Sequence, residues 1–232
     1  MQTGCSFKLS TRRRIAGGIA LAMIATLLVV AATTLAIRMT RQVEDRTERV
    51  SKTQARMERI RAALHAHAAS QGRLPCPANG AQDTGLAVPV AAAVMCTHRD
   101  GTVPWVSLGL QAEDALDGWG HKISYRVPDS FVQVDSVKSS NSSTAGLKVK
   151  DYLVDRYKLA WVLISHGASG LGAWRVFLPQ MALPGAGGNE WDNTQAAPVE
   201  FFRRGEALVD PATGVEYALN NAAHFDDVLL YE

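Results

Sequence analysis

The hydrophobic positions divide the chain into a long helical part and a part with short strands. An apolar run extends from Ile15 to Ile37 and holds no charged residue before Arg38. As a helix this run is roughly 34 Å long, enough to cross a hydrocarbon core of roughly 30 Å. It predicts a transmembrane helix over residues 15–37. A removed signal peptide and a buried helix of a soluble protein are the alternatives.

The helical pattern continues beyond the apolar run, because no proline occurs before Pro75. Gly72 provides a stop signal, so a continuing helix is predicted over residues 38–72. Residues 38–56 are charged nearly all round, and we expect them to form a solvated neck.

The apolar stripe of this helix widens only at its C-terminal end. Met57, Ile60 and Leu64 recur at helical spacing there. Such a stripe indicates a face that docks on a globular domain.

Short apolar runs replace the helical period after Gly72. They are TVPWVSL, KISYRV, SFVQVDSV, KLAWVLIS, AWRVFL and DDVLLY, with glycine, proline, asparagine and aspartate between them. Such runs predict short strands. Residues 73–232 are therefore expected to form a globular domain in which a small antiparallel β-sheet packs on the helix, an α+β fold.

Charge and cysteine placement agree with a single-pass topology. Residues 1–14 carry a basic segment, which the positive-inside rule keeps in the cytoplasm. Cys76 and Cys96 then fall on the exported side, where a disulfide between them can form and would stabilise the fold by about 3 kcal/mol. A metal site with His98 is the alternative, but it lacks a fourth ligand at a recognisable spacing.

Candidate chemistry is sparse. The net charge of +2 is too small to indicate a nucleic-acid partner. The chain has no P-loop, H-E-x-x-H or dinucleotide glycine pattern, so we expect no cofactor and no small-molecule substrate. In SHGASG, Ser165 and His166 are adjacent on a strand and point to opposite faces, and a distant acid such as Asp226 does not repair this geometry. The sequence predicts no enzyme.

The stretch LDGWGHKISYRV allows two interpretations. Asp117, Trp119 and His121 could converge on a ligand, or the stretch could form a structural turn. Gly118 and Gly120 permit unusual backbone angles, and an aspartate bonds to nearby amides. We favour a turn at Asp117, Gly118, Trp119 and Gly120, in which Trp119 covers the junction of helix and sheet.

The order of these elements resembles the type IV pilin and type II secretion pseudopilin superfamily. In the major pseudopilins a D-x-W-G turn leads into a strand, a strand ending S-x-G-x-x-G follows, and an acidic pair with aliphatics closes the sheet. The matching positions are Asp117 to Gly120, Ser165 to Gly170 and Asp226 to Leu229. Together with the basic N-terminus, the long helix and the proline-and-cysteine loop, the resemblance covers most of the chain.

This resemblance implies a pilin-like fold and an anchor in the bacterial inner membrane, with the N-terminus cytoplasmic and the C-terminal domain periplasmic. The chain would be a subunit or accessory component of a type IV pilus or type II secretion-like assembly. Its partners would be the lipid bilayer and other pilin-like or secretion-system subunits. The alternative is a membrane-anchored periplasmic binding or sensory module outside any filament, which would need a preformed apolar pocket.

The chain departs from the family's pattern at two places. Pilin-like precursors are cut after a glycine, and a glutamate stands five residues into the mature chain. Here the candidate processing site is Gly18 and Ile19, and the fifth position is Met23. The major pseudopilins carry a calcium loop, and in this chain Ser169 stands where an aspartate commonly follows S-x-G. Asp192, Asp226 and Asp227 remain as possible donors, and the last two are expected to form a turn or surface pair.

Overall fold

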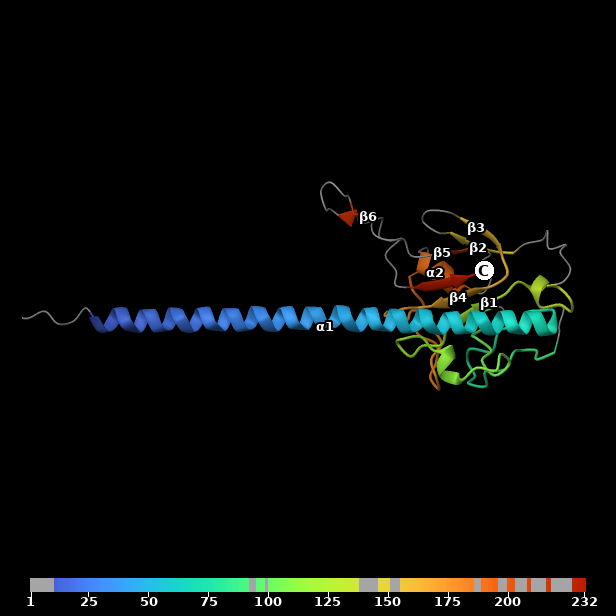
Figure 1. Ribbon diagram of the computed structural model, residues 1–232, viewed down its shortest axis with the longest axis horizontal. Helices are drawn as coiled ribbons and strands as arrows, with labels where there is room; N and C mark the ends of the chain where they lie inside the picture. Colours follow the sequence, from blue (N-terminus) through green and yellow to red (C-terminus); the bar gives the residue numbers. More distant parts are fainter. Residues whose placement is uncertain are drawn as a thin grey trace, which may run out of the picture. The chain divides into compact units, whose positions relative to one another are not determined.

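The computed structural model describes residues 11–91, 95–98, 100–137, 146–150, 155–185, 189–195, 200–202, 208–209, 216–217 and 227–232. The chain divides into two compact units, Met1–Thr47 and Glu48–Glu232. Helix α1, Thr11–Gln71, contributes residues to both units (Figure 1).

The first unit carries the apolar segment of α1. More than half of the surface of its large apolar side chains is exposed, at Met23, Ile24, Leu27, Leu28, Val29, Val30, Leu35, Ile37 and Met39. The described part of the chain contains one helix that is long and apolar enough to cross a membrane. In length and composition, this helix agrees with the predicted transmembrane segment.

The second unit combines the C-terminal part of α1 with short elements. They are η1 Ala112–Ala115, β1 Ser124–Arg126, η2 Asp129–Phe131, β2 Leu147–Lys150, β3 Arg156–Leu159, β4 Val162–Ser165, α2 Asn189–Thr194, β5 Glu200–Phe202, β6 Leu208–Val209, β7 Glu216–Tyr217 and β8 Val228–Tyr231. A long helix beside a small antiparallel sheet is the α+β layout that the sequence predicts.

The antiparallel sheet has the strand order β1-β4-β8. Leu163 at its centre lies opposite Tyr125 of β1 and Leu230 of β8. A second sheet has the order β3-β2-β5, in which β2 is antiparallel to β3 and parallel to β5. Strands β6 and β7 pair with each other.

The central strand β4 is buried on both faces. Leu163 belongs to the cluster that contains Met57, Ile60 and Leu64 of α1. Its neighbours Val162 and Ile164 belong to a second cluster, which strands β2 and β5 complete with Val149 and Phe201. Because successive side chains of a strand alternate between its faces, the first sheet lies between α1 and the second sheet (Figure 1).

Helix α1 ends where the sequence predicts. Gly72 adopts a left-handed backbone with φ 67° and donates its N–H to the carbonyl of Ala68 at 2.9 Å. Cys76 and Cys96 are disulfide-bonded, with 5.4 Å between their Cα atoms, and both are buried. This bond holds the loop after α1 next to the core cluster.

The expectation of a solvated neck through residue 56 is wrong at its C-terminal end. Thr53 is fully buried, and the guanidinium of Arg56 donates to the carbonyls of Leu116 and Asp117. The contact between helix and domain therefore begins before Met57. A charged sequence hides this contact, because the helix uses a hydroxyl, a guanidinium and its own backbone instead of apolar side chains.

Three of the predicted strands are absent. In residues 102–108, Thr102 forms isolated bridges with Ala78 and Ser124, and residues 105–108 form turns, with Leu108 N donating to Pro104 O at 3.0 Å. Residues 130–137 form the end of η2 and further turns, and residues 173–178 form bends with one isolated bridge at Trp174. The run KLAWVLIS is split between β3 and β4. The break between these two strands falls at residues 160–161, and in residues 173–178 a positive φ at Phe177 interrupts the extended backbone.

Candidate functional site

The Asp117–Gly120 stretch is a closed turn between η1 and β1. The backbone N–H of Asp117 donates to His121 O at 2.8 Å, and Gly120 N donates to Asp117 O at 3.2 Å. The carboxylate oxygen Oδ1 of Asp117 accepts from Trp119 N at 2.9 Å and from His121 N at 2.8 Å. Gly120 has φ 86°, which a residue with a side chain adopts only under strain. The predicted turn is thus present, with Asp117 bonded to local amides.

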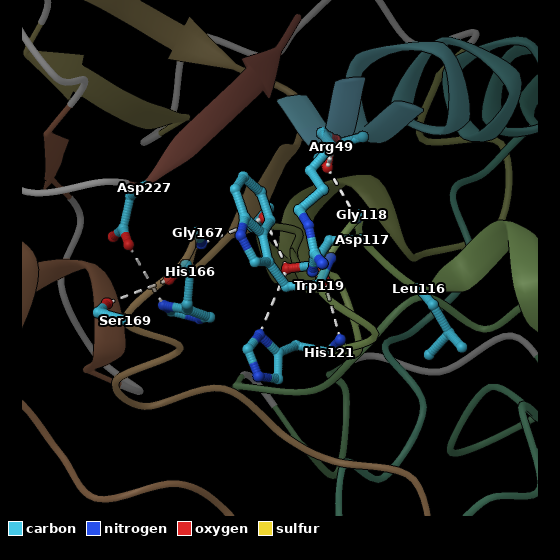
Figure 2. A network of polar contacts seen from close by, with 12 residues as sticks. Arg49, Leu116, Asp117, Gly118, Trp119, His121, His166, Gly167, Ser169 and Asp227 are labelled. Carbon is cyan, nitrogen blue, oxygen red and sulfur yellow. Dashed lines mark hydrogen bonds and ion pairs between the residues drawn. The ribbon is translucent and has the colours of Figure 1, made fainter. Parts of the chain in front are cut away.

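This turn is fastened to helix α1. Gly118 N donates to the hydroxyl oxygen of Thr53 at 2.9 Å, and that hydroxyl donates to Arg49 O at 2.8 Å. A Cβ at position 118 would overlap the backbone of Arg49, which lies directly against Gly118 (Figure 2). Glycine is therefore required at this position by close approach of two backbones. Trp119 is half-buried beside the junction.

The second carboxylate oxygen of Asp117 points into the interior. Asp117 is 1% exposed, and its Oδ2 accepts from Ser165 Oγ of β4 at 2.8 Å. His121 Nδ1 lies 3.7 Å from the same oxygen. The Asp117 carboxylate raises the pKa of His121 above its usual value, although burial of the ring acts in the opposite direction. A buried anion is tolerated here because several donors surround it.

A second group of polar side chains surrounds His166, the residue after β4. Its Nε2 lies 3.1 Å from Ser124 Oγ. Its Nδ1 lies 3.7 Å from Asp227 Oδ1, and Figure 2 shows this pair. Asn193 of α2 donates to the other carboxylate oxygen of Asp227 at 2.9 Å. Each of these four side chains belongs to a buried residue. These four polar side chains connect β1, β4, α2 and the start of β8.

Serine, histidine and aspartate in this order resemble a nucleophile, a base and an orienting acid. However, Ser124 and His166 are each 1% exposed, which leaves no space for a substrate atom beside Ser124 Oγ. Burial, together with the charge of Arg126, lowers the pKa of His166 to about 3, so the ring is neutral at neutral pH. The arrangement is that of a buried polar cluster, in which the hydrogen-bonded pairs Ser124–His166 and Asn193–Asp227 face each other across 3.7 Å.

The candidate calcium donors have different environments. Asp227 is buried at 2% exposure, so its expected place in a surface pair is wrong, and Asp226 lies outside the described residues. Ser169 donates to Glu190 at 3.0 Å, and Asp192 lies in α2. Within the described ranges, no group of three or more histidine, cysteine, aspartate or glutamate side chains could hold a metal ion.

The remaining predicted sites divide between the two units. Met57, Ile60 and Leu64 are at most 1% exposed and face the core, and the disulfide of Cys76 and Cys96 lies beside them. Gly18 and Ile19 lie within α1 in the first unit. The helix docking face and the possible processing site therefore belong to different compact units of the chain.

Sequence reasoning missed Thr53, Ser124 and Asn193. Thr53 is detectable in principle, because it lies four residues before Met57 on the same helix face. Ser124 and Asn193 carry no local signal, since their partners His166 and Asp227 are distant in sequence. Strand pairing brings Ser124 to His166, and the placement of α2 brings Asn193 to Asp227.

Comparison of the chain with protein-family models, curated proteins and solved structures finds no match. Its function must therefore be argued from the features of the chain itself. These are an apolar helix, a domain that packs on the continuation of that helix, and a turn fastened to it.

Proposed function

We propose that the chain is a membrane-anchored, pilin-like subunit or accessory component of a type IV pilus or type II secretion-like assembly. The proposal depends on one observation, which is that α1 has exposed apolar side chains in one part and buried apolar side chains in another. Its apolar side chains from Met23 to Met39 are exposed, whereas Met57, Ile60 and Leu64 are buried against the antiparallel sheet. An exposed apolar helix segment is suited to a bilayer or to neighbouring helices.

The proposed mechanism is physical. The apolar segment holds the subunit in the bacterial inner membrane, with the N-terminus in the cytoplasm and the domain in the periplasm. The segment packs beside the helices of other subunits, and Gly17, Gly18 and Ala20 allow close approach. The sheet and its loops present a surface to partners. The buried Ser124–His166–Asp227 network has a structural role in this proposal.

The position of Met23 favours a second candidate function. A registering glutamate would stand at this position in a pilin-like subunit cut after Gly18, and Met23 is instead an exposed apolar residue. The same anchored domain could then act as a periplasmic binding or sensory module outside any filament. The two candidates differ in processing and in helix partners.

The intact mass of the protein, purified from native membranes and alkylated without reduction, tests both candidates. The proposal expects a mass that fits cleavage after Gly18, with Cys76 and Cys96 protected from alkylation. An unprocessed mass with the same protection would support the anchored module instead. Alkylation of both cysteines would contradict the exported location of the domain.

A photo-crosslinking residue at Val30, which is 58% exposed, tests the helix contacts in native membranes. A subunit of an assembly is expected to give adducts with other single-helix subunits or with copies of itself. The same probe at Tyr157, an exposed residue of β3, tests separately whether the surface of the domain contacts a partner, and samples without irradiation are the control for nonspecific capture. Adducts with lipid alone at Val30 would argue against incorporation into an assembly.

A further inference from the structure

A pocket of about 420 Å³ opens on the second unit between the loop around Gly85, the η1 region and the segment at Phe177. Its apolar walls include Val103, Trp105 and Leu116. Pockets of this size with apolar and aromatic walls and a few polar groups are typical of ligand sites. Neither the docking face of α1 nor the buried polar network forms part of it.

The indole of Trp105 is a fixed wall of this pocket. Gly85 has φ 61°, and a Cβ there would overlap the indole, so the ring lies directly on the glycine backbone. Val106 N donates to Gly85 O at 2.9 Å, and Trp105 N donates to Val103 O at 2.9 Å. The aromatic surface is therefore held in place before any ligand arrives.

Phe177 lies at the edge of the pocket with an exposed side chain and an unfavourable backbone conformation. Phe177 is 87% exposed, and its φ of 55° lies in the left-handed region. Phe177 N donates to Asp83 Oδ2 at 2.9 Å, and the nearby Trp174 indole lies on Gly80, where no Cβ fits. Left-handed backbone at a non-glycine residue costs about 1–3 kcal/mol and is concentrated at functional sites. An exposed phenyl ring held in this way indicates a contact surface.

The charges of the pocket are unbalanced. The ammonium of Lys122 is bonded to Gly80 O, to Gln82 O and to the carboxylate of Asp83. Its charge is thus compensated. Glu113 borders the pocket, and its carboxylate has no hydrogen-bond or ion-pair partner among the described residues. The pocket therefore presents aromatic surface and one uncompensated negative charge, which together suit a cation with an apolar stem.

We propose that this pocket binds a basic side chain, arginine above all, presented by a partner protein. The aliphatic stem would lie against Val103 and Leu116, and the guanidinium would contact the aromatic rings and pair with Glu113. Arginine is favoured over lysine because its planar group stacks on aromatic faces and is weakly hydrated. A protein is favoured over a free guanidinium compound because apolar side chains are exposed at Phe177, which lines the pocket, and at the sequence neighbours of lining residues, Leu86, Val106 and Leu178.

The test uses the full chain in detergent micelles and follows the indole N–H resonance of Trp105, assigned with Trp105→Phe. The probes are a short capped peptide with arginine between leucines, the same peptide with citrulline in place of arginine, and argininamide alone. The arginine peptide is expected to shift the resonance saturably. The citrulline peptide, in which a neutral urea of similar shape replaces the guanidinium and its charge, is expected to bind at least about fivefold more weakly.

Two variants complete the test. Glu113→Gln is expected to weaken arginine-peptide binding by about fivefold, whereas Glu44→Gln, which removes the same charge from an exposed position of α1, is expected to leave it unchanged. Phe177→Ser alters an exposed side chain and is expected to weaken binding without unfolding the domain. Equal binding of the arginine and citrulline peptides, or no effect of Glu113→Gln, would overturn the proposal. Argininamide binding as tightly as the peptide would overturn the assignment to a partner protein.

Discussion

Asp117 performs several tasks with one carboxylate. Its Oδ1 closes the turn by accepting two backbone N–H groups, and its Oδ2 accepts from Ser165 of the central strand. Hydrogen bonds to a charged group contribute about 1.5–3 kcal/mol each, and a buried donor left without a partner destabilises further. Asp117 therefore links the helix–turn junction to β4.

We expect Asp117→Asn to lower the free energy of unfolding by about 2–4 kcal/mol, because an amide NH₂ replaces one acceptor oxygen opposite a donor. Urea unfolding of the full chain in detergent measures this change. Asp155→Asn is the matched control, because the Asp155 carboxylate is partly exposed, lies 3.6 Å from Lys148 Nζ and accepts a hydrogen bond from the exposed Tyr157 hydroxyl at 2.9 Å. Similar midpoints for the two variants would contradict the structural role of Asp117.

His166 makes the fold sensitive to acid. Its folded pKa of about 3 lies below the unfolded value of 6.5, so the unfolded chain binds a proton that the folded chain excludes. The stability that this residue contributes is present above pH 6.5 and is lost as the pH falls toward 3. Between pH 7 and pH 5 the loss is about 2 kcal/mol.

His166→Gln is expected to remove this part of the pH dependence, even if it lowers stability at neutral pH. Unfolding free energies at pH 7 and pH 5 for the two proteins measure the difference. His121 titrates in the opposite sense, because Asp117 raises its pKa, so its contribution is lost as the pH rises. Parallel pH profiles for wild type and His166→Gln would show that the buried ring is not the acid-sensitive group.

At the scale of elements, α1 changes its environment along its length. Its second-unit part uses Met57, Ile60 and Leu64 for apolar packing, and it uses Thr53 and the backbone of Arg49 for contact with the turn. The arginine side chain at position 49 is exposed. The same helix therefore contributes side chains at some positions and only backbone at others.

We expect Leu64→Ala to lower the free energy of unfolding by about 2–5 kcal/mol, because it opens a cavity in the main core cluster. Arg49→Ala keeps the backbone against Gly118 and is expected to change stability by less than about 0.5 kcal/mol. Thermal or urea melting of both variants tests this division of the helix. An equal loss for the two would show that position 49 acts through its side chain.

At the scale of the whole molecule, the second unit is held by a sheet with two covered faces and by one covalent link. The disulfide between Cys76 and Cys96 closes a loop with a sequence separation of 20 beside the helix end. In the loop-entropy model, such a link restricts the unfolded chain more than the folded one.

Replacing both cysteines by serine is expected to lower the free energy of unfolding by about 3 kcal/mol. Cys5→Ser, at a position outside the described residues, is the control and is expected to have no effect. Chemical unfolding without reductant compares the three proteins. Unchanged stability of the double variant would mean that the loop is ordered by its packing alone.

Local features of the sequence were enough to predict some elements. The apolar helix, its end at Gly72, the α+β layout and the Asp117 turn depend on composition, periodicity or glycine placement. Strands were predicted less well, because short apolar runs also form turns when prolines or left-handed residues intervene. Residues 102–108 and 173–178 are examples.

The sequence by itself determined where the long helix runs and which of its faces is apolar, since these depend on neighbours within a few residues. Only the tertiary structure decided that Thr53 meets Gly118, that Ser124 and Asp227 flank His166, and that Glu113 borders the pocket with Trp105. These contacts join segments that are distant in sequence. The physical reason is that strand pairing and packing select their partners, whereas local propensity acts only along the chain.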